Sequence, residues 1–139
     1  MSSSTIQIHQ EHTLFSVDEA SLINWLRRCL ALLTTKTYKV SYILVSDNEL
    51  RTINKDHLNH DYFTDIVTFD LSEPEGSVEI EMYLSLDRIK ENAQEYGVEN
   101  TEELRRVMVH GLLHVFGFDD HNEEGQLEMR EEEDKYLSI

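Results

Sequence analysis

The sequence predicts an α+β fold in which a small sheet of about four strands is covered by helices, within one domain spanning residues 1–139. Four segments carry the pattern of strands, and five carry apolar side chains at helical spacing. The chain has 139 residues, a common size for one domain, and a single proline. Because it holds no long linker, internal repeat or low-complexity tract, nothing suggests a second domain.

The first elements are a strand, a helix and a strand. Alternation predicts a strand at residues 5–10. The Ser16–Glu19 segment is a capping box, which predicts a helix that continues to about residue 33. A second strand is expected at 38–45.

A short helix and a polar loop follow. The Ser46–Glu49 segment is a second capping box and opens a helix to about residue 55. The loop after it carries His57, His60 and Asp61. Either histidine could reach a substrate, although exposed histidines without such a role are commoner.

Two further strands are expected at residues 65–71 and 78–86, on either side of the turn at 73–76. Alternation in the later strand predicts that one of its faces lies in the core. A helix at 87–96 should stop at Gly97, because glycine readily takes the left-handed conformation that ends helices.

Two helices complete the predicted fold. Asn100, with Glu103 three residues later, is expected to cap a long apolar helix. The last helix, at 126–137, is acidic: residues 123–134 hold seven acids and one base. The residues that recur at helical spacing along it are Leu127, Arg130, Asp134 and Leu137.

The charge of the chain limits the partners it can bind. There are 28 Asp and Glu residues against 12 Lys and Arg, and the formal net charge is −16. Proteins that hold nucleic-acid backbones usually present a basic surface, so contact with RNA would be confined to a local cleft. The acidic surface would suit docking on a basic protein.

The sequence features that bear on the cellular compartment agree with one another. The single Cys29 cannot form an internal disulfide, and the N-terminal residues lack the charged and apolar regions of a signal peptide. No stretch approaches the roughly 20 apolar residues that span a bilayer. We therefore expect a cytoplasmic protein without a membrane segment.

The strongest functional signal is the run from His110 to His121, HGLLHVFGFDDH. His110 and His114 lie four residues apart on a predicted helix, so their imidazoles share one face and can bind one metal ion. Gly117 is expected to end the helix in a left-handed conformation and turn the chain back. Asp119, Asp120 or His121 could then approach the pair. Three protein ligands would leave a position open for water, as in catalytic zinc sites.

Gly111 excludes one kind of metal chemistry. Metalloproteases of the helix-motif class carry a glutamate directly after the first histidine, where it acts as general base. A glycine inside a helix is about 1 kcal/mol less favourable than alanine, which suggests that something packs or binds closely over this backbone. The peptidase interpretation therefore lacks its base.

The run resembles the signature of the YbeY family of single-domain, metal-dependent endoribonucleases, which is close to H-G-x-L-H-L-x-G-Y-D-H. The positions that agree are His110, Gly111, Leu113, His114, Gly117, Phe118 in the aromatic place and Asp119. Residues 54–69 are similar to a second family segment, N-x-x-Y-R-x-K-D-x-x-T-D-V-L-S-F. The positions that agree there are Asn54, Asp61, Thr64, Asp65 and Phe69.

The resemblance implies a zinc-dependent, single-strand endoribonuclease that acts in ribosomal RNA maturation, at the 3′ end of 16S rRNA, and in ribosome biogenesis. Its partners would be ribosomal RNA and the ribosomal subunit or ribosomal proteins. Two imidazoles and a carboxylate also suit nickel, iron or manganese.

The third ligand has two candidates. The family's last histidine falls ten positions after the first, which is Asp120 here, whereas His121 lies one position further. Preserved spacing favours Asp120, and a shift of the loop by one residue would bring in His121. The residue that does not bind would remain near the metal.

The family's usual arginine aligns with Leu58, and its lysine aligns with His60. Leucine cannot stabilise a negatively charged transition state, so a cation over the phosphate would have to be Arg51, Lys55 or protonated His60. Two other functions remain open. One is a non-catalytic, metal-stabilised binding factor for ribosome assembly, and the other is a metal-dependent hydrolase of another substrate.

Overall fold

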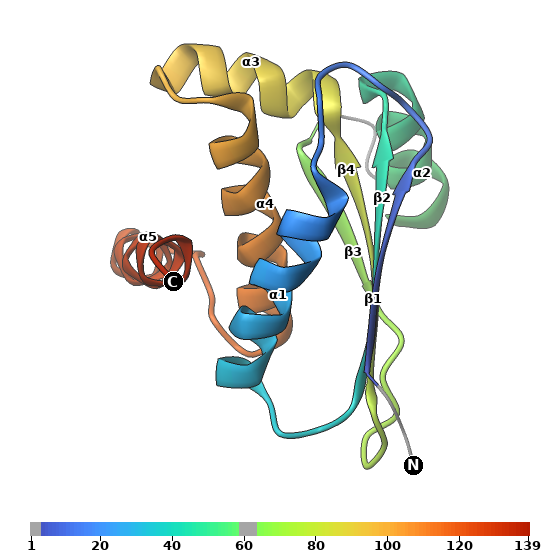
Figure 1. Cartoon of the computed structure of the whole chain (residues 1–139), viewed down its shortest axis with the longest axis vertical. Helices are drawn as coiled ribbons and strands as arrows, with labels where there is room; N and C mark the ends of the chain where they lie inside the picture. The colour runs from blue at the N-terminus through green and yellow to red at the C-terminus, as the bar shows by residue number, and fades with distance from the viewer. Residues whose placement is uncertain (1–3, 59–63) are drawn as a thin grey trace.

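The computed structural model describes residues 4–58 and 64–139, which build a four-stranded mixed sheet flanked by helices (Figure 1). The strands are β1 (Thr5–Gln10), β2 (Tyr38–Val45), β3 (Ile66–Asp70) and β4 (Val78–Ser85). Their order is β1-β2-β4-β3; β1, β2 and β4 run parallel, and β3 is antiparallel to β4. The predicted α+β fold with a small sheet is confirmed, and β3 forms one edge.

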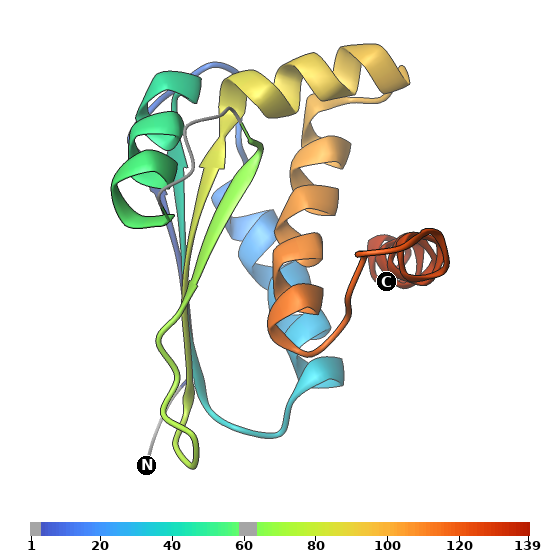
Figure 2. The same cartoon turned by 180° about the vertical axis from the view of Figure 1, so that it is seen from behind.

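The described residues also form five helices, which are α1 (Glu19–Leu33), α2 (Asp47–Leu58), α3 (Leu86–Tyr96), α4 (Asn100–Val115) and α5 (Glu123–Leu137). Figures 1 and 2 show α1 and α4 on one face of the sheet and α2 on the other. In both views α5 lies beyond α4, on the side away from the sheet. None of the described helices has the length and apolar character needed to cross a lipid bilayer.

Apolar side chains fill both sides of the sheet. Val78, Ile80, Met82 and Leu84 of β4 belong to the larger core, which packs the sheet against α1 and α4. The smaller core, around Val45, Leu50 and Val67, lies under α2. The alternation predicted for β4 is therefore confirmed, and it directs every second side chain of this strand toward α4.

One predicted helix start is confirmed and one is wrong. The Ser46–Glu49 box forms, with the Glu49 N–H donating to Ser46 Oγ at 3.2 Å. At α1 the cap is Asp18, whose side chain accepts from the Ser21 N–H. The expected Ser16 box does not form, because α1 begins at Glu19, which places Glu19 directly after the cap rather than three residues beyond it. Glu19 accepts a 2.6 Å hydrogen bond from Gln10 Nε2 instead.

The start of α4 also differs from the prediction. Glu99 is the N-cap, without a side-chain hydrogen bond, and Asn100 is already helical. Glu103 does not reach back to a cap, because it lies buried with 5 % of its surface exposed. The buried carboxyl group of Glu103 lines a cavity that His110 also lines.

The predicted last helix is confirmed as α5, and the structure shows which of its faces is buried. Met129, Glu133 and Tyr136 are buried, whereas Leu127 is 66 % exposed. Of the other residues that recur with Leu127 at helical spacing, Arg130 and Asp134 are exposed and Leu137 is half-buried. The helix therefore sets an acidic side chain, rather than Leu127, against the body of the protein.

The C-terminal end of α5 is held by two donors from other helices. Trp25 Nε1 of α1 donates to the carbonyl oxygen of Tyr136 at 2.9 Å. Arg105 of α4 donates to the carbonyl of Leu137 at 2.9 Å, and its guanidinium lies 4.5 Å from the centre of the Trp25 ring. These bonds satisfy carbonyls that a helix end leaves without partners and fix α5 on α1 and α4.

Candidate metal centre

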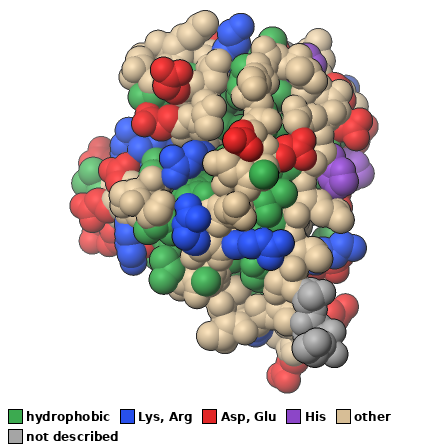
Figure 3. Space-filling view, in the orientation of Figure 1, with side chains coloured by type: hydrophobic (Ala, Val, Ile, Leu, Met, Phe, Trp, Pro, Cys, Tyr) green, Lys and Arg blue, Asp and Glu red, His purple; other side chains and the backbone are tan. Residues whose placement is uncertain are grey.

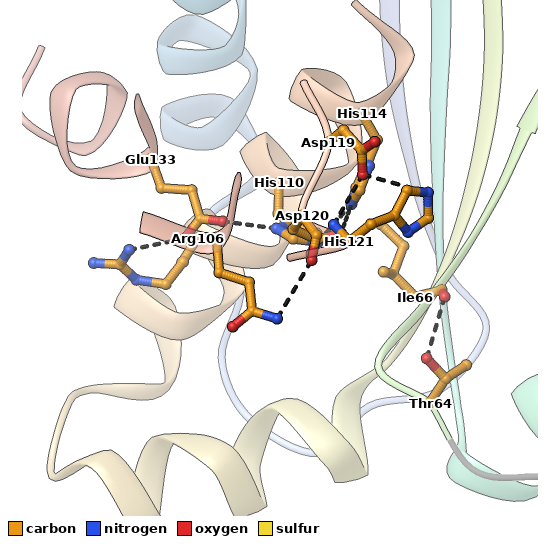
Figure 4. Close-up of polar contacts among 10 residues, drawn as sticks. Thr64, Ile66, Arg106, His110, His114, Asp119, Asp120, His121 and Glu133 are labelled. Carbon is orange, nitrogen blue, oxygen red and sulfur yellow. Dashed lines mark hydrogen bonds and ion pairs between the residues drawn. The ribbon is translucent and has the colours of Figure 1, made fainter. Parts of the chain in front are cut away.

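His110 and His114 lie one turn apart on α4, and their Nε2 atoms are 3.1 Å apart (Figure 4). Asp120, in the loop before α5, places Oδ1 3.5 Å from His114 Nε2 and Oδ2 3.8 Å from His110 Nε2. One donor atom from each residue lies within 4.8 Å of the others. Among the described residues, these three form a group that could hold a metal ion.

The turn after α4 brings Asp120 back to the histidines. Gly117 has a φ of +103°, so the predicted left-handed conformation is confirmed. The Phe118 N–H donates to the carbonyl of Leu113 at 2.9 Å, and the Gly117 N–H donates to the carbonyl of His114 at 3.2 Å. This pattern closes a helix end and reverses the chain.

His121 lies outside the group. Its side chain is 87 % exposed, and its Nε2 atom is 3.4 Å from Asp119 Oδ1. The same Asp119 oxygen accepts a 2.9 Å hydrogen bond from the His121 N–H. Of the two candidates for a third ligand, the fold brings Asp120 to the pair and turns His121 toward Asp119.

Glu133 of α5 contacts His110 from the other side of its ring (Figure 4). Its Oε2 atom is 2.6 Å from His110 Nδ1, and its Oε1 atom is 2.9 Å from Arg106 Nη1. Arg106 also pairs with Asp134 at 2.7 Å. Glu133 was missed in the sequence because it lies in a run of acids typical of a solvated face. The available signal was its spacing of four from Met129 and three from Tyr136.

The charges around His110 shift its titration. Burial alone lowers the pKa of His110, but the hydrogen bond and charge of Glu133, with the charges of Asp65 and Asp120, raise it by more. The pKa of His110 is therefore raised. Burial likewise raises the pKa of Asp65, and the nearby His110 partly opposes that increase.

A cavity of about 140 Å³ opens beside His110. Its lining includes two buried acids, Glu103 and Glu133, together with Asp65. Arg106 and Arg130 also line it. Since Arg106 is paired with Glu133 and Asp134, the exposed Arg130 is the cation on this wall that faces solvent.

The cations and histidines expected near the substrate from residues 51–60 are not found beside the metal group in the part of the chain that the structure describes. α2 continues to Leu58, so His57 is helical rather than in a loop, and its ring meets Phe69 edge-on with centroids 5.7 Å apart. Arg51 and Lys55 line a shallow site on α2, on the face of the sheet opposite α4 (Figure 2). His60 and Asp61 lie outside the described residues.

The net charge of −16 is spread unevenly. Figure 3 shows Lys and Arg side chains across the middle of the face around α1, and acidic side chains at its left margin, where α5 lies. The acidic excess is therefore concentrated in part on α5, and the rest of this face mixes cations with acidic side chains.

Comparisons with known proteins agree with these features. A family model described as Endoribonuclease YbeY matches residues 6–139. The Endoribonuclease YbeY of Cytophaga hutchinsonii is 38 % identical and covers 100 % of this chain and 98 % of its own. That of Chlorobaculum parvum is 40 % identical over 88 % of this chain and 86 % of its own.

A solved structure shares the fold. The solution structure of TM1509 from Thermotoga maritima has a TM-score of 0.63 and 30 % identity, and it covers 96 % of this chain and 87 % of the other. The family model extends over nearly the whole chain, and the two curated relatives exceed 30 % identity over most of their length. The chain therefore belongs to the YbeY family of endoribonucleases.

Proposed function

We propose that this chain is a zinc-dependent endoribonuclease that cleaves single-stranded ribosomal RNA during maturation, at the 3′ end of 16S rRNA, and so takes part in ribosome biogenesis. The observation that carries the proposal is the grouping of His110, His114 and Asp120 within 4.8 Å, in a chain of this family. A ribosomal substrate also places the protein in the cytoplasm, with ribosomal subunits or their proteins as partners.

The donor set fits a tetrahedral zinc ion. Zinc–ligand bonds of about 2.0–2.1 Å place neighbouring ligands about 3.3 Å apart. The two imidazole nitrogens are 3.1 Å apart, close to that value. Asp120 brings Oδ1 to 3.5 Å from His114 and Oδ2 to 3.8 Å from His110, and a single donor atom from each residue lies within 4.8 Å of the others. His110, His114 and Asp120 would hold the ion, and two imidazoles with one carboxylate are an accepted catalytic set. When bound, zinc supplies Lewis acidity to a phosphoryl oxygen and lowers the pKa of a coordinated water.

Side chains that line the adjoining cavity would bind and position the phosphate of the RNA. The exposed Arg130 can pair with the phosphate and stabilise its growing negative charge, a task that Leu58 cannot perform. The acids Glu103 and Asp65 line the same cavity, so they disfavour a phosphate deep inside it. The phosphate is then kept at the entrance, beside the histidines.

The proposal is tested with two ligand variants. His110→Ala and His114→Ala should each lose the metal, measured by elemental analysis, and should lose cleavage of a single-stranded ribosomal RNA fragment. Wild-type protein treated with EDTA is the control, and added zinc should restore its activity. Cleavage by a metal-free double variant would refute the mechanism.

A second candidate is a binding factor for ribosome assembly that keeps the metal for stability alone. Leu58 in the arginine position and the net charge of −16 favour it. In that case the His110→Ala variant should melt at a lower temperature than wild type yet still bind ribosomal subunits, and the wild type should show no cleavage above the EDTA control. Metal-dependent cleavage of RNA by the wild type would exclude it.

A further inference from the structure

We propose that Glu133 is a positioning residue for the metal ligand His110. By accepting a hydrogen bond from the Nδ1–H group, it keeps His110 in the tautomer whose Nε2 lone pair points toward His114 and Asp120. This inference rests on the proposed metal site and assigns it a residue from α5.

The contact itself defines the proton's position. Glu133 Oε2 lies 2.6 Å from His110 Nδ1, a short distance typical of a hydrogen bond to a charged acceptor. An ionised carboxylate can only accept, so Nδ1 must carry the proton. A neutral imidazole then has its lone pair on Nε2, the atom 3.1 Å from His114 Nε2. The tautomer suited to metal binding is therefore set before any ion arrives.

Glu133 is itself held in place. Its side chain is 8 % exposed, and a buried carboxylate is costly unless it is paired. Arg106 Nη1 supplies that pair at 2.9 Å, so each carboxylate oxygen of Glu133 has one partner. Arg106 and His110 lie one turn apart on α4, which lets one α5 side chain bridge them.

Asp134 offers a comparison within the same helix. It also pairs with Arg106, at 2.7 Å, but the described contacts of Asp134 do not include His110, and its side chain is 59 % exposed. If Glu133 only docked α5 on α4, replacing Glu133 and replacing Asp134 would change zinc affinity to a similar extent. A role in orienting His110 would be specific to Glu133.

The experiment measures zinc affinity by competition with a chromophoric chelator for wild type, Glu133→Gln, Glu133→Ala and Asp134→Asn. Partners of this kind typically change metal affinity 10–100-fold, so we expect a loss of about 100-fold for Glu133→Ala. Glu133→Gln keeps an acceptor without the charge and should lose about tenfold. Asp134→Asn should stay within about twofold of wild type, because His110 keeps its partner.

A second measurement reports the tautomer directly. Nitrogen-15 NMR of the metal-free protein, at a pH high enough that the His110 ring is neutral, should show His110 protonated on Nδ1 alone in wild type and in Asp134→Asn, and a mixture of tautomers in Glu133→Ala. A change confined to helix docking would leave this signal unaltered. If Glu133→Ala does not fold, the isosteric Glu133→Gln decides through its affinity.

The outcomes separate the two proposals. Wild-type affinity in both Glu133 variants, or an equal loss in Asp134→Asn, would overturn the role of Glu133 while leaving the metal site in place. A wild-type protein that takes up no zinc would overturn the metal site and this inference together.

Discussion

Gly111 lies against Ile66, and a Cβ atom on residue 111 would come within 2.8 Å of Ile66 Cδ1 and 2.6 Å of Met82 Sδ. The close approach that a helical glycine suggested is thus a contact between α4 and the strands β3 and β4. Because His110 precedes Gly111 directly, this contact also sets how near the metal group lies to the sheet.

Replacing Gly111 by alanine should destabilise the protein. Crowding a packed core costs about 1–3 kcal/mol, and the better helix propensity of alanine returns about 1 kcal/mol. We expect the free energy of unfolding to fall by about 1 kcal/mol, as measured by urea denaturation. Adding Ile66→Val removes the Cδ1 atom and should recover part of the loss. A Gly111→Ala protein more stable than wild type would contradict the contact.

The third ligand can be identified from two neighbouring variants. Asp120→Ala should weaken zinc binding by more than the roughly 100-fold expected for an indirect partner, because a direct ligand is lost. His121→Ala should keep wild-type affinity, since its ring faces Asp119. Elemental analysis after dialysis reports both. Loss of metal in His121→Ala alone would show that the loop shifts when the ion binds.

Glu103 should make stability depend on pH. Burial, the largest cause, acts with the charges of Asp65 and Glu133 to raise the pKa of Glu103 from 4.5 to about 7, against the opposing charges of Arg106 and Arg130. Below pH 4.5 both the folded and the unfolded states carry the proton, and between pH 4.5 and about 7 the folded state alone favours it. Stability therefore falls as pH rises through this window and stays lower above it.

The Glu103→Gln variant removes this dependence. Its free energy of unfolding should match that of wild type near pH 4 and exceed it by up to about 3 kcal/mol near pH 8, at about 1.4 kcal/mol per pKa unit. Urea denaturation in EDTA measures the difference, with the exposed Glu102→Gln as the matched control. A difference that does not change between these pH values would contradict the shift.

Arg130 should contribute to cleavage without affecting the metal. We expect Arg130→Ala to lower kcat/KM for a single-stranded RNA by about tenfold or more, since removing one stabilising group often costs this much. Arg130→Lys should keep part of the activity because it keeps the charge, and zinc content should not change. Arg27→Ala, an exposed change on α1, controls for general loss of positive charge. Equal effects of the two alanine variants would refute a local role.

The parts of the site that follow from local rules were predictable. His110 and His114 meet because four residues make about one helical turn, and Gly117 turns the chain because glycine accepts a positive φ. Asp120 follows within the same short segment. The buried face of the sheet was equally predictable, since every second side chain of β4 is apolar and lies in the core.

Other parts depend on how distant elements dock. Glu133 reaches His110 across 23 residues of sequence, and only the packing of α5 reveals which of its many acids is buried. Glu19, expected in the Ser16 box, instead accepts a hydrogen bond from Gln10 of β1. Arg51 and Lys55 were reasonable cations by sequence position, but α2 packs on the opposite face of the sheet. Tertiary packing, rather than local propensity, decided each case.

Because Trp25 donates a hydrogen bond to the carbonyl of Tyr136, the intrinsic fluorescence of Trp25 reports on the docking of α5. Trp25 is the single tryptophan of the chain, and its indole is buried where α5 meets α1. Its emission will therefore move to longer wavelength when α5 separates and water reaches the ring. Stopped-flow fluorescence of the unlabelled protein can follow the arrival of the helix that carries Glu133, in real time and apart from any assay of RNA.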